Sequence, residues 1–283
     1  MTAAPTDQWS LRTAFDTCYE KVWAKGKNAE GSARNGEAAI DFFGADTLLD
    51  AITTERVDAW ITRLQQIGNG NATVNRKLAV LSKLMSFAQR RNKMRTKPFF
   101  ERQAEAKGRI RFLTQEEETQ LLALLSRRGK DCHAEVVCVL VDTGMRPSEL
   151  YRLEGRDCNM EQGVLTIWLA KNGESRSVPM TQRVKDILSR RMEGIKTGPL
   201  FPHSNAWLRE AWDRAKAEMG LSKDKQFVPY ALRHTFASRL SQRRVPLRSV
   251  QMLMGHKTIS MTVRYEHLNP ETLAEAIKVL EAC

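Results

Sequence analysis

Apolar residues in the first third of the chain recur every three or four positions, which is the spacing of an amphipathic helix. The pattern is clearest over residues 72–91, where Val74, Leu78 and Leu81 lie on one side of the predicted helix. Comparable patterns predict further helices over residues 9–26, 30–43 and 53–68. We therefore expect an all-α unit over residues 1–95.

The pattern changes after a connecting stretch over residues 96–110, which is rich in charge and lacks a sustained apolar period. Residues 163–180 alternate between apolar and polar positions around Asn172-Gly173, as in a β-hairpin. Further helices are predicted after Thr114 and over residues 134–142, 181–192, 204–219, 230–242, 246–254, 259–267 and 270–282. The sequence thus predicts a mainly α protein: an N-terminal bundle, a linker, and a mixed α/β unit over residues 111–283 with a small β-sheet.

The charge balance favours a polyanionic partner. Lys and Arg number 45 against 33 Asp and Glu, for a net charge of +12. The basic residues are spread over both halves of the chain rather than gathered on one amphipathic helix, which favours nucleic acid over an anionic membrane. No apolar run approaches the roughly 20 residues that span a membrane, and the N-terminus lacks a signal pattern. We therefore expect a cytosolic protein.

The cysteines do not indicate a metal centre. There are five, with no Cys-x-x-Cys pair and no matching histidine spacing, so neither a zinc site nor a disulfide framework is expected. No cofactor is predicted. The outer face of the helix over 72–91 carries Arg76, Lys77, Lys83 and Arg90. These side chains either form a solvated face or follow a DNA backbone, and the sequence leaves both interpretations open.

Residues suited to phosphodiester chemistry occur in separated motifs along the second unit. They are TGMRPSEL (143–150), AKNGESRSVP (170–179), PYALRHTFAS (229–238), LMGH (253–256) and TVRYEH (262–267). Two arginines, a lysine, a histidine and a tyrosine form a set that binds a phosphodiester without metal ligands. In this order the motifs resemble the tyrosine recombinase (phage integrase) family, over roughly residues 110–270.

The resemblance implies a role for each of these side chains. Tyr265 is the nucleophile that forms a phosphotyrosyl ester, and nearby positive charge is expected to favour its phenolate. Arg146 and Arg233 hold the non-bridging phosphate oxygens. Lys171 protonates the departing 5′ oxygen, and His256 binds the phosphate or assists proton transfer. Glu149, three residues after Arg146, either braces that arginine or acts as a carboxylate at a helix N-terminus.

One position departs from the family pattern. The family usually has a histidine three residues before its second arginine, and Tyr230 stands there in this chain. Tyrosine can donate a hydrogen bond to phosphate but is a poor base at neutral pH, which leaves the general base open. We interpret His234 and His267 as structural residues.

The resemblance further implies a site-specific recombinase of a compact phage or prophage type, without an arm-binding domain. Such an enzyme acts as a homotetramer on double-stranded DNA with inverted-repeat core sites, exchanges strands through a Holliday junction, and integrates or excises a mobile element such as a viral genome. Accessory DNA-bending or directionality factors are possible partners, and the implied location is the nucleoid in the cytoplasm of a bacterial host. Residues 270–283 are expected to pack on a neighbouring protomer. A type IB topoisomerase that nicks and reseals DNA, and a catalytically inactive DNA-binding regulator, remain as alternatives.

Overall fold

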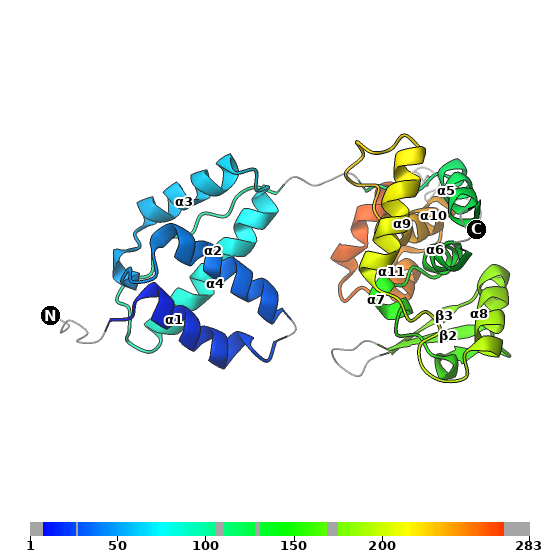
Figure 1. The fold of residues 1–283 in the computed structure, drawn as a ribbon, viewed down its shortest axis with the longest axis horizontal. Helices are drawn as coiled ribbons and strands as arrows, with labels where there is room; N and C mark the ends of the chain where they lie inside the picture. The colour runs from blue at the N-terminus through cyan, green and yellow to red at the C-terminus, as the bar shows by residue number, and fades with distance from the viewer. Residues whose placement is uncertain (1–7, 27, 106–109, 128–130, 169–174, 269–283) are drawn as a thin grey trace, which may run out of the picture. The chain divides into compact units, whose positions relative to one another are not determined.

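The chain divides into two compact units, Met1–Gly108 and Arg109–Cys283, shown in Figure 1. The computed structural model describes residues 8–26, 28–105, 110–127, 131–168 and 175–268. No helix in these ranges combines the length and the apolar character that crossing a membrane requires. These residues are mainly helical and contain one small sheet, which confirms the predicted fold class.

The first unit is the predicted helical bundle. Its helices are α1 (Leu11–Cys18), α2 (Ala29–Phe43), α3 (Thr54–Gln66) and α4 (Asn71–Gln89). The first predicted helix is α-helical only to Cys18 and continues as a π-helix, Tyr19–Trp23. The buried positions of α4 include Val74, Leu78 and Leu81, the residues that its periodicity places inward. Their burial against α1, α2 and α3 makes α4 the central helix of this unit.

The stretch predicted as a linker is bound to the first unit over much of its length. The amide of the buried Asn75 donates to the carbonyl of Gln103 over 2.9 Å, and the Gln103 N–H donates back to Asn75 Oδ1 over 2.9 Å. The Phe99 N–H donates to Thr54 Oγ1 over 3.2 Å. Hydrogen bonds from side chains of α3 and α4 thus hold this stretch in place, although it lacks a periodic apolar pattern. The first unit therefore extends beyond residue 95, the boundary that the sequence predicts.

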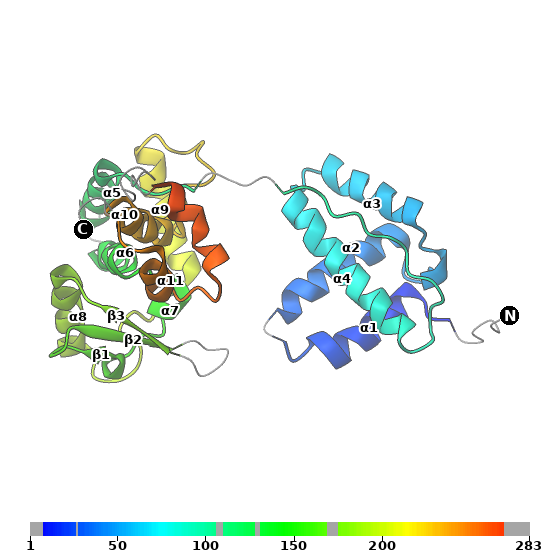
Figure 2. The ribbon, with the colours of Figure 1, turned by 180° about the vertical axis from the view of Figure 1, so that it is seen from behind.

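The second unit has seven α-helices and an antiparallel sheet among its described residues. The helices are α5 (Gln115–Arg127), α6 (Asp131–Thr143), α7 (Pro147–Leu150), α8 (Gln182–Gly194), α9 (Asn205–Glu218), α10 (Ala231–Gln242) and α11 (Leu247–Met254). The sheet order is β1 (Cys158–Asn159), β2 (Val164–Trp168) and β3 (Ser175–Pro179). The sheet lies beside α8, as Figure 2 shows.

The predicted hairpin is confirmed by the pairing of β2 with β3. Leu165 lies opposite Val178, and Ile167 lies opposite Arg176. Because side chains alternate along a strand, Arg176 shares the buried face of the sheet with Val178. The predicted turn, with Lys171, lies outside the described residues.

The predicted helix over 259–267 is wrong. This segment forms two 3₁₀ turns, Ile259–Met261 and Val263–Leu268. It contains several β-branched residues, which disfavour an α-helix. In addition, the hydroxyl oxygen of the buried Thr262 lies 2.8 Å from His256 Nδ1, so this side chain bonds to a residue outside the segment.

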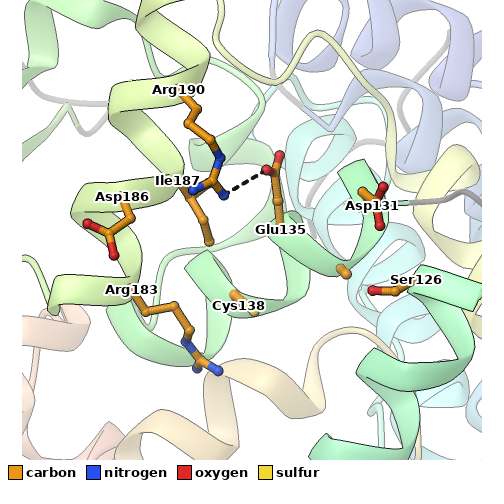
Figure 3. A pocket seen from close by; sticks show the side chains of 9 residues that line it. Ser126, Asp131, Glu135, Cys138, Arg183, Asp186, Ile187 and Arg190 are labelled. Carbon is orange, nitrogen blue, oxygen red and sulfur yellow. Dashed lines mark hydrogen bonds and ion pairs between the residues drawn. The ribbon is translucent and has the colours of Figure 1, made fainter.

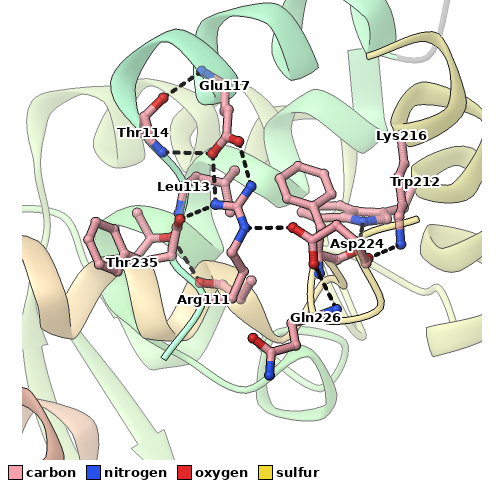
Figure 4. Close-up of polar contacts among 12 residues, drawn as sticks. Arg111, Leu113, Thr114, Glu117, Trp212, Lys216, Asp224, Gln226 and Thr235 are labelled. Atoms are coloured by element: carbon pink, nitrogen blue, oxygen red, sulfur yellow. Dashed lines mark hydrogen bonds and ion pairs between the residues drawn. The ribbon is translucent and has the colours of Figure 1, made fainter. Parts of the chain in front are cut away.

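The start of the second unit is tied to α10 by the polar contacts in Figure 4. Arg111 pairs with Glu117 of α5 and, over 2.8 Å, with Asp224 in the loop before α10. The buried Leu113 N–H donates to Thr235 Oγ1 over 2.9 Å, and that hydroxyl donates to the Ala231 carbonyl over 2.8 Å. These contacts fix the N-terminal half of α10, which carries Arg233.

A second polar interface joins α6 to α8 around the pocket in Figure 3. Arg190 Nη2 lies 3.2 Å from Glu135 Oε1, and Arg183 Nη2 lies 2.6 Å from Asp142 Oδ1. The buried Glu118 accepts from both Arg183 and Arg239, so it connects α5 with α8 and α10. The charged side chains of this pocket therefore pair with one another and hold the helices of the second unit together.

The Thr235 contact predicts a specific loss of stability. Thr235→Val preserves the side-chain shape but leaves the buried Leu113 N–H without its acceptor, at a cost of about 1–3 kcal/mol. The measurement is the urea-induced unfolding transition of the second unit. Thr119→Val is the matched control, because the exposed Thr119 hydroxyl only donates to the Gln115 carbonyl in α5. A Thr235→Val loss no larger than the control's, expected below about 0.5 kcal/mol, would contradict this role.

Candidate active site

The turn between α6 and α7 places the first arginine. Gly144 follows α6 with φ +62, and a Cβ atom there would lie 2.4 Å from Phe236 Cδ1. Both the left-handed backbone and the close approach require glycine. Arg146 is the N-cap residue of α7, and Pro147 stands at the first helical position. The fixed φ of proline suits the first turn of a helix, so α7 begins directly after Arg146.

The Glu149 carboxylate lies buried between two arginines. It accepts the Arg146 backbone N–H over 2.9 Å and Arg146 Nη1 over 2.8 Å. Oε2, which accepts the Arg146 backbone N–H, also accepts Arg176 Nη2 over 2.7 Å. Burial alone would raise the pKa of Glu149, but the bonds and charges of Arg176 and Arg146 outweigh it and lower the pKa to about 2. Glu149 thus caps α7 and pairs with Arg146.

Arg176 was missed in the sequence analysis. Its side chain is 8% exposed, and besides pairing with Glu149 it donates from Nε to the Leu253 carbonyl over 3.0 Å. A Cβ atom on Gly255 would lie 2.9 Å from Arg176 Cδ, so this glycine admits the arginine at the end of α11. Alternation along AKNGESRSVP puts Arg176 on the apolar face with Val178, a signal that could have identified it.

Arg233 is a buried cation without a carboxylate partner among the described residues. Its guanidinium is 1% exposed and donates to the carbonyls of Gly144 and Met254, while Nε has no partner in the described part of the chain. Burial lowers the pKa of Arg233 to about 10, helped by the charges of Arg146 and Arg176. The group stays protonated at neutral pH, and its unneutralised charge makes the site attractive to an anion.

His256 follows α11 directly after Gly255, in the turn that the LMGH motif forms. Its Nδ1 lies 2.8 Å from Thr262 Oγ1, and its carbonyl accepts the Gln251 side-chain amide over 3.0 Å. Burial, followed by the charges of Arg233 and Arg146, lowers the pKa of His256 to about 4. The imidazole is therefore neutral at physiological pH, and it can donate one hydrogen bond without adding charge.

Tyr265 lies in the second 3₁₀ turn and is 1% exposed. Its carbonyl accepts the Ser241 hydroxyl over 2.7 Å, and its own Oη lies 2.7 Å from His234 Nδ1. Burial raises the pKa of Tyr265 to about 12, although the charges of Arg233 and Arg264 act in the opposite direction. The positive charges favour the phenolate, but desolvation outweighs them, so the phenol keeps its proton in the free protein at neutral pH.

The remaining predicted residues lie in different surroundings. Tyr230 is 46% exposed at the N-terminus of α10. It lines a pocket of about 350 Å³ together with Arg146. His234, taken from sequence as structural, contacts the hydroxyl of Tyr265. Lys171 lies outside the described residues.

The structure links the other predicted site residues of the second unit through a small set of contacts. Glu149 and Arg176 connect Arg146 with the end of α11, where His256 lies. Arg233 bonds the Gly144 carbonyl beside Arg146 and the Met254 carbonyl beside His256. The charge of Arg233 acts on both the His256 imidazole and the Tyr265 phenol, so these groups lie within electrostatic reach of one another. This arrangement can bind a phosphate and present a nucleophile to it.

The predicted DNA-contacting residues lie on α4 of the first unit, with Arg90 as its C-cap residue. Arg76, Lys83 and Arg90 are exposed, and Lys77 is half-buried. Seven-residue spacing puts the three exposed side chains within about 20° of one line along the helix. In the described part of the chain they have no carboxylate partner. They form a line of uncompensated charge, which we call the α4 basic line.

Comparison with known proteins identifies relatives of the second unit. The model of the phage integrase family matches residues 111–272. The tyrosine recombinase XerA of Pyrococcus furiosus is 32% identical over 176 residues, which is 59% of this chain and 60% of that protein. XerD of Yersinia pestis is 32% identical over 176 residues, covering 56% and 58% of the two chains. The matched region thus spans about three fifths of the length of each of these relatives.

Solved structures share the fold across more of the chain. The integrase of transposon Tn1549, solved with a circular intermediate DNA, has a TM-score of 0.81 at 19% identity and covers 97% of this chain and 99% of that one. A lambda integrase tetramer bound to a Holliday junction has a TM-score of 0.75 at 21% identity, with coverage of 89% and 79%. These similarities concern the fold. Together with the family match over most of the second unit, they confirm the assignment made from the motifs: the chain belongs to the phage integrase family of tyrosine recombinases.

Proposed function

We propose that this protein is a site-specific DNA recombinase that cleaves and rejoins strands through a 3′-phosphotyrosyl ester at Tyr265. The observation that carries the proposal is the buried Arg233 guanidinium, which lacks a carboxylate partner among the described residues. A buried charge without a counter-charge is costly, and a bound anion would remove this cost. Arg146, held by Glu149, supplies a second guanidinium beside it.

The proposed reaction uses these groups at one phosphate. Arg233 and Arg146 hold the non-bridging oxygens, where negative charge grows in the transition state. His256 donates a hydrogen bond to the same phosphate. The Tyr265 Oη bonds to phosphorus as the bond to the 5′ oxygen breaks, and that oxygen takes a proton from Lys171. Attack by a 5′ hydroxyl on the phosphotyrosyl ester reverses these steps, so the bond energy is kept without a cofactor.

The first unit extends the proposal to duplex binding. The α4 basic line spans about 21 Å at 1.5 Å per residue, which is long enough to meet several successive phosphates. Residues 1–95 are proposed as the unit that holds the core site. The units then bind one duplex together, with chemistry confined to the second.

The biological setting is proposed from the relatives. A lambda integrase tetramer is known on a Holliday junction, and the Tn1549 integrase on a circular intermediate DNA. We propose by analogy a tetramer that exchanges strands at inverted-repeat core sites to integrate or excise a mobile element. Residues 270–283 would contact the neighbouring protomer, accessory factors would set direction, and the protein would act on DNA in the cytoplasm.

Covalent capture tests the proposed chemistry. Wild type and Tyr265→Phe are incubated with fragments of the DNA that flanks the coding region, denatured in detergent, and the attached DNA is sequenced. We expect wild type alone to retain DNA, through a 3′ phosphate, at a few inverted-repeat sites. Adducts at all sequences would favour a topoisomerase. Tight binding without adducts would favour the inactive regulator.

The salt dependence of DNA binding tests the α4 basic line. Exchanging Arg76, Lys83 and Arg90 to Gln should reduce the slope of log affinity against log salt by about 0.9 per residue, or ~2.7 in all. Filter binding to one fixed duplex between low and moderate salt measures this slope. The matched control exchanges three exposed basic residues of the second unit, Lys196, Lys223 and Lys225. An equal loss of slope in both triple variants would show that α4 has no special role.

A further inference from the structure

The geometry around Tyr265 points to a general base for the reaction. We propose that His234 accepts the proton of the Tyr265 hydroxyl during strand cleavage and returns it during rejoining. The inference rests on the proposed function, since it takes Tyr265 as the nucleophile. It assigns a catalytic role to a histidine that the motif comparison interpreted as structural.

The first observation is the direct contact. His234 Nδ1 lies 2.7 Å from Tyr265 Oη, although 31 positions separate the two residues in the chain. The contact is not an accident of a loose segment, because Ser241 of the same helix fixes the Tyr265 carbonyl over 2.7 Å. Helix α10 therefore holds the tyrosine both by its backbone and by its reactive oxygen.

The second observation concerns which ring nitrogen carries the proton. Burial, followed by the charges of Arg264 and Arg233, lowers the pKa of His234 to about 4, so the ring is neutral at pH 7. If Nδ1 held its proton, the buried Tyr265 hydroxyl would have no acceptor among the described residues, which is costly. The phenol must therefore donate, with His234 Nδ1 as acceptor and the ring proton on Nε2.

The third observation is the place of His234 on its helix. It follows Tyr230 by four residues, so both side chains lie on the same face one turn apart, and their rings meet edge to face at 5.2 Å. Tyr230 stands where the family pattern has a histidine. His234 supplies an imidazole to this same face, and it reaches the nucleophile directly.

The proposed step balances. Tyr265 Oη forms its bond to phosphorus, its proton moves to His234 Nδ1, and the 5′ oxygen leaves with the proton of Lys171. In rejoining, the protonated His234 returns its proton as the Tyr265 oxygen departs. The groups that face His234 are Arg233 and Tyr230 of α10, and Arg264 and Tyr265 of the 3₁₀ turn. A phosphate bound at Arg233 adds negative charge, which raises the pKa of His234 and strengthens it as a base.

The tautomer provides a test that needs no DNA. Long-range ¹H–¹⁵N spectra of protein labelled at its five histidines distinguish protonated from bare ring nitrogens. Loss of one set of signals in His234→Asn assigns that residue. We expect a neutral ring at pH 7 with the proton on Nε2. A proton on Nδ1 would overturn the inference, because the ring would then donate to Tyr265 instead of accepting from it.

Single-turnover cleavage tests the base role itself. His234→Asn keeps an amide oxygen near the position of Nδ1, so it can accept the hydrogen bond but cannot take the proton. With nicked duplexes made from a captured flanking fragment, we expect cleavage at pH 7 to slow by roughly 10²–10⁴-fold. The variant's rate should rise about tenfold per pH unit up to pH 9, because solvent must then remove the proton. The wild-type rate should level off once His234 is neutral.

The controls separate this inference from the proposed function. His267→Asn removes an exposed histidine two residues after Tyr265 and should cleave within about threefold of wild type. A His234→Asn variant with the wild-type rate and pH profile would refute the base while leaving the recombinase intact. Faster cleavage by His234→Asn would mean that the histidine restrains Tyr265, which also refutes it. If wild type itself forms no adduct on any flanking fragment, the proposed function fails and the inference falls with it.

Discussion

The buried Glu149 carboxylate is the contact on which the rest of the site depends. It neutralises Arg176, whose side chain reaches from β3 to the Leu253 carbonyl at the end of α11, and it braces Arg146 at the start of α7. One acidic group thus fixes the relative positions of the sheet, the first arginine and the turn that carries His256. Without it, the buried Arg176 and the half-buried Arg146 would repel each other. The negative charge of Glu149 thus serves to hold the two arginine side chains in fixed positions.

Arg233, the second arginine of the site, is held without a compensating carboxylate among the described residues. Arg233 bonds the Gly144 and Met254 carbonyls, which orient its guanidinium without cancelling its charge. Because Arg146 already shares Glu149 with Arg176, the region as a whole keeps an excess of positive charge. A phosphodiester would supply the missing negative charge. The same field acts on the neighbouring groups, where it helps burial to keep His234 and His256 neutral and opposes the burial that keeps Tyr265 protonated.

Much of the fold could be predicted from the sequence, because residues close together in the chain determine these helices and strands. The period of α4, the alternation of β2 and β3 and the start of α7 after Arg146 all follow from neighbouring residues. The motifs likewise indicated Arg233, His256 and Tyr265. The contact of His234 with Tyr265 could not be predicted, because it joins residues that are distant in the chain. The 3₁₀ turns around Thr262 and the binding of residues 99–103 to the first unit depend on tertiary partners in the same way.

The most direct test of this account is to locate the DNA attachment on the protein. Wild-type adducts are digested with nuclease and trypsin, and the peptides are analysed by mass spectrometry. We expect a nucleotide to remain only on the tryptic peptide that begins at Tyr265, after cleavage at Arg264. A nucleotide on any other residue, Tyr230 included, would contradict the assignment of the nucleophile and the arrangement of the site around it.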